Sequence, residues 1–397
     1  MLSTKQLFLN HVAQTSPSPI GIEMVKAEGV FLEDVHGKQY IDLISGFSVA
    51  NIGHSNPKVV NAVKQQAEQY MHLIVYGEFI QQPQVAYAKL LSDNLPPSLN
   101  SVYFTNSGTE ATEGAMKLAK RVTKRSKIIS FNKSYHGSTQ GALSVMGDEY
   151  WRNAFRPLLP DVYHVDYNSQ AAIDLIDSRT ACVVMETIQA EAGIIVPTKK
   201  WIQAIRKKCD EHCVLLILDE IQCGFGRTGS LWAFEQFDMV PDVLLLGKAL
   251  GGGMPLGAFI ADKKLMNTLT HDPVLGHITT FGGHPVSCAA GKAALEVLLE
   301  SNFIKEAKRK EAILVKHIHH PSIISIKSCG LWMAVQFDSF ETNHAIIQKC
   351  IEKGLITDWF LFAADCLRIA PPLIITDEQL IQACLWILES IVEVKGA

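Results

Sequence analysis

DVLLLGKALGGGMPLGAFIA, residues 242–261, joins two short apolar runs through a lysine and a cluster of glycines. The runs DVLLLG (242–247) and GAFIA (257–261) are unbroken by alternating polar residues, which is typical of strands buried on both faces of a sheet. Lys248 comes directly after the first run. Because lysine is rarely buried, this position is either the start of a solvated loop or a reactive amine that faces a cleft.

Similar apolar runs precede this stretch and alternate with helical patterns. The alternation predicts an α/β fold, with a mostly parallel sheet covered by helices. Ligands of such sheets bind beyond the carboxyl ends of the strands, where several of the runs are followed by polar residues. The further predicted strands are SVYFT (101–105), KIISF (127–131), ACVVMETI (181–188) and VLLILD (214–219), and the residues at the strand ends are 106–109, 135–136, 186–191, 219–222 and 248.

The pattern changes near residue 291 to helices with a few strands, among them GLWMAVQF (330–337) and CLRIA (366–370). This change predicts a smaller α+β domain after the large one. We expect an N-terminal segment (1–45) packing with the small domain, a large ligand-binding domain (46–290) and the C-terminal small domain (291–397).

Composition excludes several classes of function. The chain of 397 residues is 48% hydrophobic and 19% charged, yet no apolar run reaches the roughly 18 residues that cross a bilayer. The first residues, MLSTKQLFLNHVAQ, lack the apolar core of a secretory signal. A net charge of -4 does not indicate the basic surface that binds nucleic acid or an anionic membrane. Nine cysteines without framework spacing favour reduced thiols in the cytoplasm.

A metal site is not expected. Only Cys209, His212 and Cys213 resemble ligands, and no second pair follows at the spacing of a zinc site. The segment that contains them is instead typical of an amphipathic helix leading into a strand. The histidines of HIHHP (317–321) are interpreted as a solvated turn.

Two further patterns suggest chemistry beside Lys248. Ser107, Gly108 and Thr109 stand directly before a predicted helix, whose first N–H groups favour an anion. Asp219 ends a buried strand, where a carboxylate needs a cation or a donor. A Walker-type nucleotide site is excluded because the chain has no GxxxxGK[ST], and its glycine clusters do not fit the dinucleotide pattern GxGxxG.

One ligand would use all three features, and it is pyridoxal phosphate (PLP). It needs a lysine for its aldehyde, a carboxylate for its ring nitrogen and an anion cradle for its phosphate. Lys248, Asp219 and residues 107–109 supply these, and Tyr135 and Ile221 are candidates for the two faces of the ring.

Residues 216–258 resemble the signature of the class III PLP-dependent aminotransferases, the group with ornithine, acetylornithine and 4-aminobutyrate aminotransferases. The resemblance extends from about residue 20 to the C-terminus and implies a fold-type-I PLP enzyme. Further family blocks occur in order: SGTEA (107–111), YHG (135–137), ETIQAEAG (186–193), TTFGGHP (279–285) and RIAPPL (368–373).

The resemblance implies a role for each matching residue at the cofactor. Lys248 matches the lysine that forms an imine with the cofactor and then moves a proton, and Asp219 matches the carboxylate paired with the ring nitrogen. Thr280 matches a threonine that reaches the phosphate in the neighbouring subunit, which implies a homodimer with shared active sites. The other expected cofactor contacts are Ser107, Gly108 and Thr109 at the phosphate, Tyr135 and Ile221 at the ring faces, and Gln222 at the phenolic oxygen.

The resemblance also implies how the substrate is bound. Arg368 matches the arginine that grips a substrate carboxylate, and Glu191 matches the glutamate that neutralises it when no carboxylate is present. Two positions depart from many relatives. Ser138 stands where they have an arginine, which places 4-aminobutyrate and ornithine-type substrates in doubt, and Phe47 stands where ornithine aminotransferases tend to have tyrosine. Thr187 and Ala190 replace a usual proline and glycine.

The expected activity is transfer of an amino group from an amine, ω-amino or amino-acid donor to a keto acid, 2-oxoglutarate being favoured, by a ping-pong cycle. An aminomutase or decarboxylase of the same family would share Lys248 and Asp219 and is the first alternative. A catalytically silent PLP-binding protein is the second, and the intact lysine, carboxylate and phosphate cradle count against it.

Overall fold

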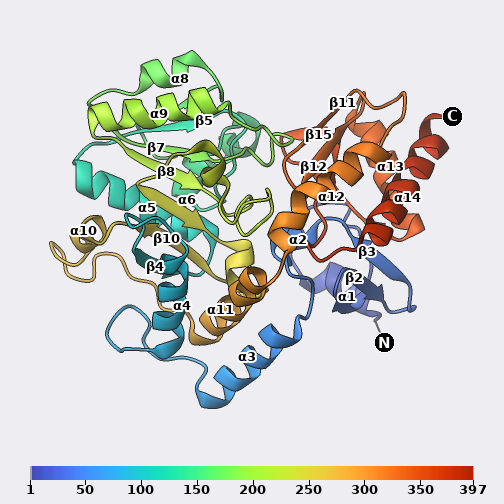
Figure 1. The fold of residues 1–397 in the computed structure, drawn as a ribbon, viewed down its shortest axis with the longest axis horizontal. Coiled ribbons are helices and arrows are strands. Elements are labelled where there is room, and N and C mark those ends of the chain that lie inside the picture. Colours follow the sequence, from blue (N-terminus) through green and yellow to red (C-terminus); the bar gives the residue numbers. More distant parts are fainter. Residues whose placement is uncertain (1, 397) are drawn as a thin grey trace.

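The computed structural model describes residues 2–396 and contains three sheets (Figure 1). The largest has seven strands in the order β4-β10-β9-β8-β7-β5-β6. Its strands are β4 (Ser101–Thr105), β5 (Lys127–Phe131), β6 (Val162–Val165), β7 (Thr180–Glu186), β8 (Leu215–Asp219), β9 (Val243–Leu246) and β10 (Gly257–Ala261). The predicted α/β class with a mostly parallel sheet is confirmed.

One strand of this sheet runs against the others. β10 pairs antiparallel with both β4 and β9, whereas β5, β6, β7, β8 and β9 pair parallel. Because β10 is antiparallel to both neighbours, β4 and β9 point the same way. The carboxyl ends of six strands, β4, β5, β6, β7, β8 and β9, therefore lie at one edge of the sheet. The edge strand β6 is only half-buried and lacks the unbroken apolar run by which the other strands were predicted.

Helices cover both faces of the seven-stranded sheet, and alternate strand residues face the two layers. Val183 and Leu216 belong to the apolar cluster that includes the buried face of α9 (Lys199–His212). Cys182 and Ile217 belong to a second cluster with the buried face of α5 (Gly108–Thr123). Burial on both faces explains why these strands are apolar throughout.

Two four-stranded sheets lie beside the C-terminal helices, on the right of Figure 1. In the first, β3 pairs parallel with β13, so the N-terminal strands are completed by residues from near the other end of the chain. The first sheet contains β1 (Met24–Glu28), β2 (Phe31–Asp34), β3 (Gln39–Asp42) and β13 (Leu355–Ile356), and the second contains β11 (Ser325–Ser328), β12 (Met333–Gln336), β15 (Ala363–Ile369) and β14 (Trp359–Phe360). The domain limits predicted from the sequence stay a prediction.

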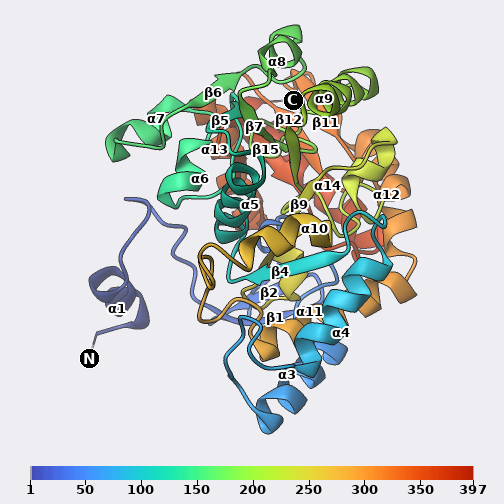
Figure 2. The ribbon, with the colours of Figure 1, turned by 90° about the vertical axis from the view of Figure 1, so that its left-hand side faces the viewer.

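The remaining helices pack around these sheets, apart from α1 (Thr4–His11), which has no buried residue and stands apart in Figure 2. No helix within residues 2–396 combines the length and the apolar character needed to cross a membrane. The other helices are α2 (Ser45–Ser48), α3 (Pro57–Gln69), α4 (Gln82–Asp93), α6 (Gln140–Ser144), α7 (Glu149–Arg152), α8 (Gln170–Leu175), α10 (Lys263–Met266), α11 (Pro285–Glu300), α12 (Phe303–His317), α13 (Phe340–Lys353) and α14 (Asp377–Lys395), with short 3-10 turns η1 (Asn153–Phe155), η2 (Ala233–Phe237), η3 (Lys248–Gly251) and η4 (Asn267–Leu269).

Candidate active site

A cavity of about 300 Å³ lies at the carboxyl edge of the seven-stranded sheet. All five strand ends named from the sequence contribute to its wall. The lining residues are Gly108, Thr109, Tyr135, His136, Gly137, Ser138, Glu186, Ile188, Ala190, Glu191, Asp219, Ile221, Gln222, Cys223 and Lys248.

Lys248 begins the turn η3, directly after β9. Its backbone has a φ of 50°, in the left-handed region that a non-glycine residue seldom adopts. The Nζ atom points into the cavity and donates a hydrogen bond to Oε1 of Gln222 at 3.1 Å. Burial lowers the pKa of the Lys248 amine, so its uncharged form is easier to reach than in an exposed lysine. The residue is thus suited to exchange a proton inside the cavity.

Asp219 ends β8 and is nearly fully buried. One carboxylate oxygen accepts a hydrogen bond from the backbone N–H of Ile221 at 2.9 Å, and the other lies 2.7 Å from Nδ1 of His136. Burial acts to lower the pKa of His136, but the hydrogen bond and charge of Asp219 outweigh it, and the pKa is raised. The imidazole therefore holds the Asp219 carboxylate in one orientation. His136 is not among the residues predicted from the sequence, although the YHG block that contains it was recognised.

Glu186 is a second buried carboxylate that the sequence-based prediction leaves out. It ends β7 and accepts hydrogen bonds from the backbone N–H groups of Tyr135 at 3.1 Å and Ala190 at 2.7 Å. Burial raises the pKa of Glu186 to about 8. The Glu186 side chain therefore joins the loop after β5, which carries Tyr135, to the loop after β7, which carries Glu191.

The start of α5 forms a tight concave surface. A Cβ added to Gly108 would lie 2.7 Å from Cδ1 of Ile221, and one added to Gly137, at a φ of 123°, would lie 2.3 Å from Oγ1 of Thr109. Gly137 therefore admits only glycine, whereas a side chain at Gly108 would have to displace the tip of Ile221. Ser107 is the N-cap of α5, and its hydroxyl accepts from the N–H of Glu110. Helical N–H groups at this end have no partners inside the helix and suit an anion.

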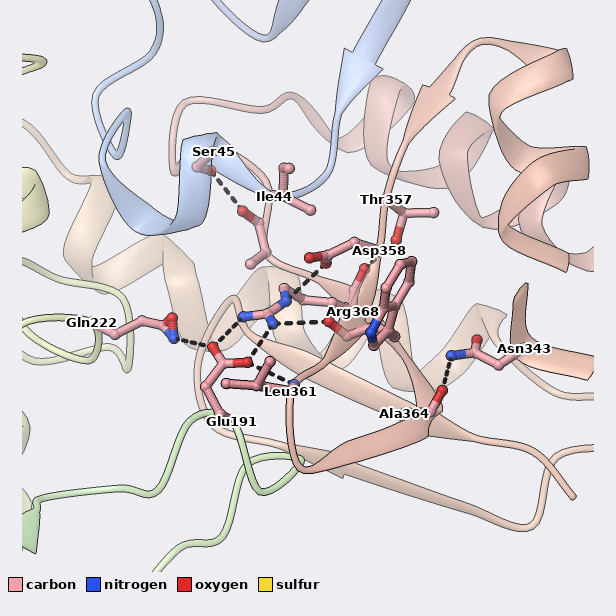
Figure 3. Close-up of polar contacts among 12 residues, drawn as sticks. Ile44, Ser45, Glu191, Gln222, Asn343, Thr357, Asp358, Leu361, Ala364 and Arg368 are labelled. Atoms are coloured by element: carbon pink, nitrogen blue, oxygen red, sulfur yellow. Dashed lines mark hydrogen bonds and ion pairs between the residues drawn. The ribbon is translucent and has the colours of Figure 1, made fainter. Parts of the chain in front are cut away.

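Arg368, Phe47 and Ser107 are not among the residues that line the cavity. Arg368 lies behind the lining residue Glu191 and contacts two carboxylates (Figure 3). Its Nη1 and Nη2 atoms donate to the two oxygens of Glu191 at 3.0 and 2.8 Å, and its Nε atom donates to Oδ1 of Asp358 at 2.9 Å. Glu191 also accepts from Nε2 of Gln222 at 3.1 Å. Hydrogen bonds therefore run without a break from Lys248 through Gln222, Glu191 and Arg368 to Asp358.

Charge and burial act differently on the two carboxylates. Burial acts to raise the pKa of Glu191, but Arg368 outweighs it and the pKa is lowered. For Asp358 burial prevails over Arg368, and the pKa rises to about 6. The guanidinium lies 4.2 Å from the centre of the Phe360 ring and 5.2 Å from that of Phe47, the predicted substrate residue. Asp358 was not predicted, because it lies outside the recognised family blocks.

Thr280 does not line the cavity of its own chain and is exposed. Its apolar neighbours Ile278 and Phe281 are exposed as well. Ser138, in contrast, is part of the cavity wall, and its hydroxyl lies 3.2 Å from the Tyr135 hydroxyl.

Within residues 2–396, no group of three or more His, Cys, Asp or Glu side chains could hold a metal ion. Of the two cysteines that resembled ligands, Cys209 is buried on the inner face of α9 and Cys213 is exposed at its end.

Comparison with known proteins identifies similar chains over nearly the whole length. The model of the family described as aminotransferase class-III matches residues 12–392. An acetylornithine aminotransferase from Methanopyrus kandleri is 38% identical over 367 residues, which cover 91% of this chain and 92% of the relative. Another, from Caldanaerobacter subterraneus subsp. tengcongensis, is 36% identical over 382 residues and covers 93% and 94%.

Solved structures agree in fold. An ornithine aminotransferase from Toxoplasma gondii, which holds PLP at partial occupancy in its active site, superposes with a TM-score of 0.91 at 30% identity, covering 98% of this chain and 93% of that one. A transaminase from the marine bacterium Virgibacillus gives a TM-score of 0.91 at 26% identity, covering 98% of both chains.

Proposed function

The chain belongs to the class III aminotransferases, and on this premise we propose that it transfers an amino group from an amine-ended donor to 2-oxoglutarate. It is a PLP-dependent transaminase, as the sequence resemblance implied. The donor, the acceptor and the roles of individual residues are the proposal. The single observation that carries it is the pairing of Arg368 with Glu191, a residue that lines the same cavity as Lys248 and Asp219.

The cavity has the donor set and shape that PLP requires. The first residues of α5, Gly108 and Thr109, line the cavity, and the unpaired N–H groups of a helix N-terminus suit a phosphate group. Lys248 supplies an amine, Asp219 a carboxylate, and Gln222 an amide within reach of the lysine. When bound, PLP accepts the amino group and delocalises the negative charge that develops on the reacting carbon.

Lys248 and Asp219 would divide the proton chemistry between them. The pKa of Lys248 is lowered by burial, so its Nζ atom can take a proton from the substrate carbon and return it. Asp219 would hold a proton on the ring nitrogen by accepting a hydrogen bond from it. His136 would keep the carboxylate oriented through its contact at 2.7 Å.

Arg368 and Glu191 would let one cavity accept two kinds of substrate. A donor whose reacting carbon bears no carboxylate would leave the ion pair closed. A keto acid would bring its own carboxylate, replace Glu191 on the guanidinium and gain a bidentate charge-assisted contact. Ser138 leaves the cavity wall without an additional cation, which favours a donor that has no carboxylate, such as 1,4-diaminobutane. N-acetylornithine is the second candidate donor, and it is suggested only by the names of the relatives.

We also propose a homodimer in the cytoplasm. Support for the dimer comes from large exposed apolar side chains near Thr280 and in the loop before α4, among them Ile80 at 95% exposure and Val274 at 71%. Thr280, exposed in one subunit, would then reach the phosphate in the other. The nine cysteines form no disulfide, in keeping with a reducing compartment. Sedimentation of the holoprotein would test the dimer.

The function is tested by measuring the two half-reactions separately. The protein loaded with PLP is mixed with 1,4-diaminobutane, N-acetylornithine or glutamate, and the protein loaded with pyridoxamine phosphate is mixed with 2-oxoglutarate. Cofactor absorbance then reports each single turnover. Rapid conversion with one of the two amines and with 2-oxoglutarate supports the proposal, whereas loss of carbon dioxide or an isomerised amine without a keto acid would contradict it.

A further inference from the structure

Arg368 is held by two carboxylates that come from different parts of the fold. Its outer edge, Nη1 and Nη2, contacts Glu191 from the loop after β7, and its inner edge, Nε, contacts Asp358. The family resemblance accounts for Glu191 alone. The second carboxylate is a feature of this chain that needs its own explanation.

Asp358 is fixed to the same hairpin as Arg368. The backbone N–H of Arg368 donates to the backbone oxygen of Asp358 at 2.9 Å, and Thr357 Oγ1 donates to the backbone oxygen of Arg368 at 2.5 Å. Asp358 and Arg368 therefore move as one unit. Glu191 belongs to the seven-stranded sheet and joins this unit only through its contacts with the guanidinium and with the N–H groups of Leu361 and Phe362.

Without Asp358, Arg368 would have no counter-ion during the interval after Glu191 has left it and before the keto-acid carboxylate has bound. Its side chain is only 2% exposed, and a buried cation without a partner is strongly unfavourable. The remaining neighbours are the Phe360 ring and the backbone oxygen of Trp359, at 3.1 Å from Nη2. Neither carries a negative charge. Asp358, on the edge opposite to Glu191, keeps the guanidinium paired while its outer edge is free.

We propose that Asp358 is a positioning residue that holds Arg368 by its Nε edge while Glu191 and the carboxylate of the keto acid exchange on the Nη edge. This inference rests on the proposed function, because it requires that a keto-acid carboxylate binds Arg368. Asp358 itself does not touch the substrate. Its effect should therefore be confined to the half-reaction in which the exchange occurs.

The test uses holoenzyme carrying Asp358→Ala, Asp358→Asn or, as a matched control, Asp365→Ala. Asp365 lies in β15, three residues before Arg368, and its carboxylate contacts Gln336 instead. For Asp358→Ala we expect kcat/KM for 2-oxoglutarate to fall about ten- to a hundredfold, since a charge-assisted hydrogen bond is lost. The half-reaction with 1,4-diaminobutane should be unchanged. Asp358→Asn should recover only part of the rate, because its amide oxygen can still accept from Nε but supplies no negative charge. Asp365→Ala should match the wild type.

Arg368→Ala, measured in parallel, separates this inference from the proposed function. If Arg368→Ala leaves the 2-oxoglutarate half-reaction unchanged, the proposed substrate contact is wrong and the role of Asp358 is overturned with it. If Arg368→Ala impairs that half-reaction but Asp358→Ala does not, only the role of Asp358 is overturned. Equal losses in both half-reactions for Asp358→Ala would show a general structural role and overturn it too.

Discussion

The two ends of the cavity are built in different ways. At the cofactor end, Asp219 and Lys248 directly follow β8 and β9, which are neighbours in one parallel sheet. At the proposed substrate end, Glu191 comes from the loop after β7 of that sheet, whereas Arg368 and Asp358 come from a hairpin of a separate four-stranded sheet.

This difference implies that the contacts around Asp219 and Lys248 are permanent, whereas the contact between Glu191 and Arg368 can be exchanged for another. The distance between Asp219 and Lys248 is set by strand pairing inside one buried sheet, which cannot change without unfolding. The contact between Glu191 and Arg368 joins side chains from two separate sheets, supported by hydrogen bonds from the N–H groups of Leu361 and Phe362 to Glu191. A site that must hold one cofactor and accept two classes of substrate is well served by such a division.

The largest expected effect is at the permanent end. Lys248→Ala should slow the amine half-reaction by about 10³- to 10⁴-fold, because a positioned proton carrier is lost. Borohydride reduction of the cofactor-loaded wild type, followed by peptide mapping, should find the cofactor attached to Lys248. A label on any other lysine would refute the assignment. Lys263→Ala, in the exposed helix α10, is the control.

Removal of Asp219 should have the next largest effect. Asp219→Ala should reduce transamination about 10²- to 10³-fold through loss of electrostatic stabilisation. It should also lower the pKa of His136, because the anion that raises this pKa is gone. Histidine NMR titration of wild type and variant measures the second effect. Near-normal turnover in the variant would contradict the role of the carboxylate.

Substitutions at the exchangeable end, Arg368 and Glu191, should reduce the rates less, and the two variants should impair opposite half-reactions. Arg368→Ala should weaken the 2-oxoglutarate half-reaction by about ten- to a hundredfold and spare that of 1,4-diaminobutane. Glu191→Ala should impair the amine half-reaction, since an unneutralised guanidinium then faces a donor without a carboxylate. Single-turnover absorbance with each substrate alone decides the matter. Equal losses of rate in both half-reactions for both variants would contradict the proposal that the contact between Glu191 and Arg368 is exchanged between substrates.

The smallest expected effect is on stability. Asp358 has a folded-state pKa of about 6, above the value of about 3.9 in an unfolded chain. Its ionisation therefore destabilises the fold increasingly as pH rises from 4 to 6. Asp358→Asn lacks this ionisation, so its stability relative to wild type should grow over that range by about 3 kcal/mol at most. Urea denaturation at pH 4.5 and 7.5 measures the change, with Asp365→Asn as control. A difference that is independent of pH would contradict the shifted pKa.

The same division governs what could be predicted from the sequence. Strand ends in a buried parallel sheet produce apolar runs followed by polar residues, so the cavity wall around Asp219 and Lys248 was visible as a pattern. The antiparallel direction of β10 was not, because a strand buried on both faces has the same composition in either direction. The half-buried edge strand β6 lacked an apolar run altogether.

The remaining site residues could not all be predicted from the sequence pattern. Glu191 and Arg368 were found through family blocks, and their contact was implied by resemblance. Asp358 stands ten residues before Arg368 in a segment without a recognised block, and only the fold of the hairpin brings its carboxylate to the guanidinium. His136 and Glu186 were visible at strand ends, but their partners, Asp219 and the N–H of Tyr135, depend on side-chain orientation inside the cavity.

The pairing of β3 with β13 has a consequence for synthesis on the ribosome. Until residues 355–356 have emerged, β3 presents an unpaired edge, the kind of surface on which other chains can add a strand. A nascent chain at that point already contains Asp219 and Lys248, but neither Asp358 nor Arg368. The residues that we propose distinguish the substrates, Arg368 and Asp358, are therefore made late, and until β13 appears the growing chain carries an unpaired strand edge on which aggregation can begin.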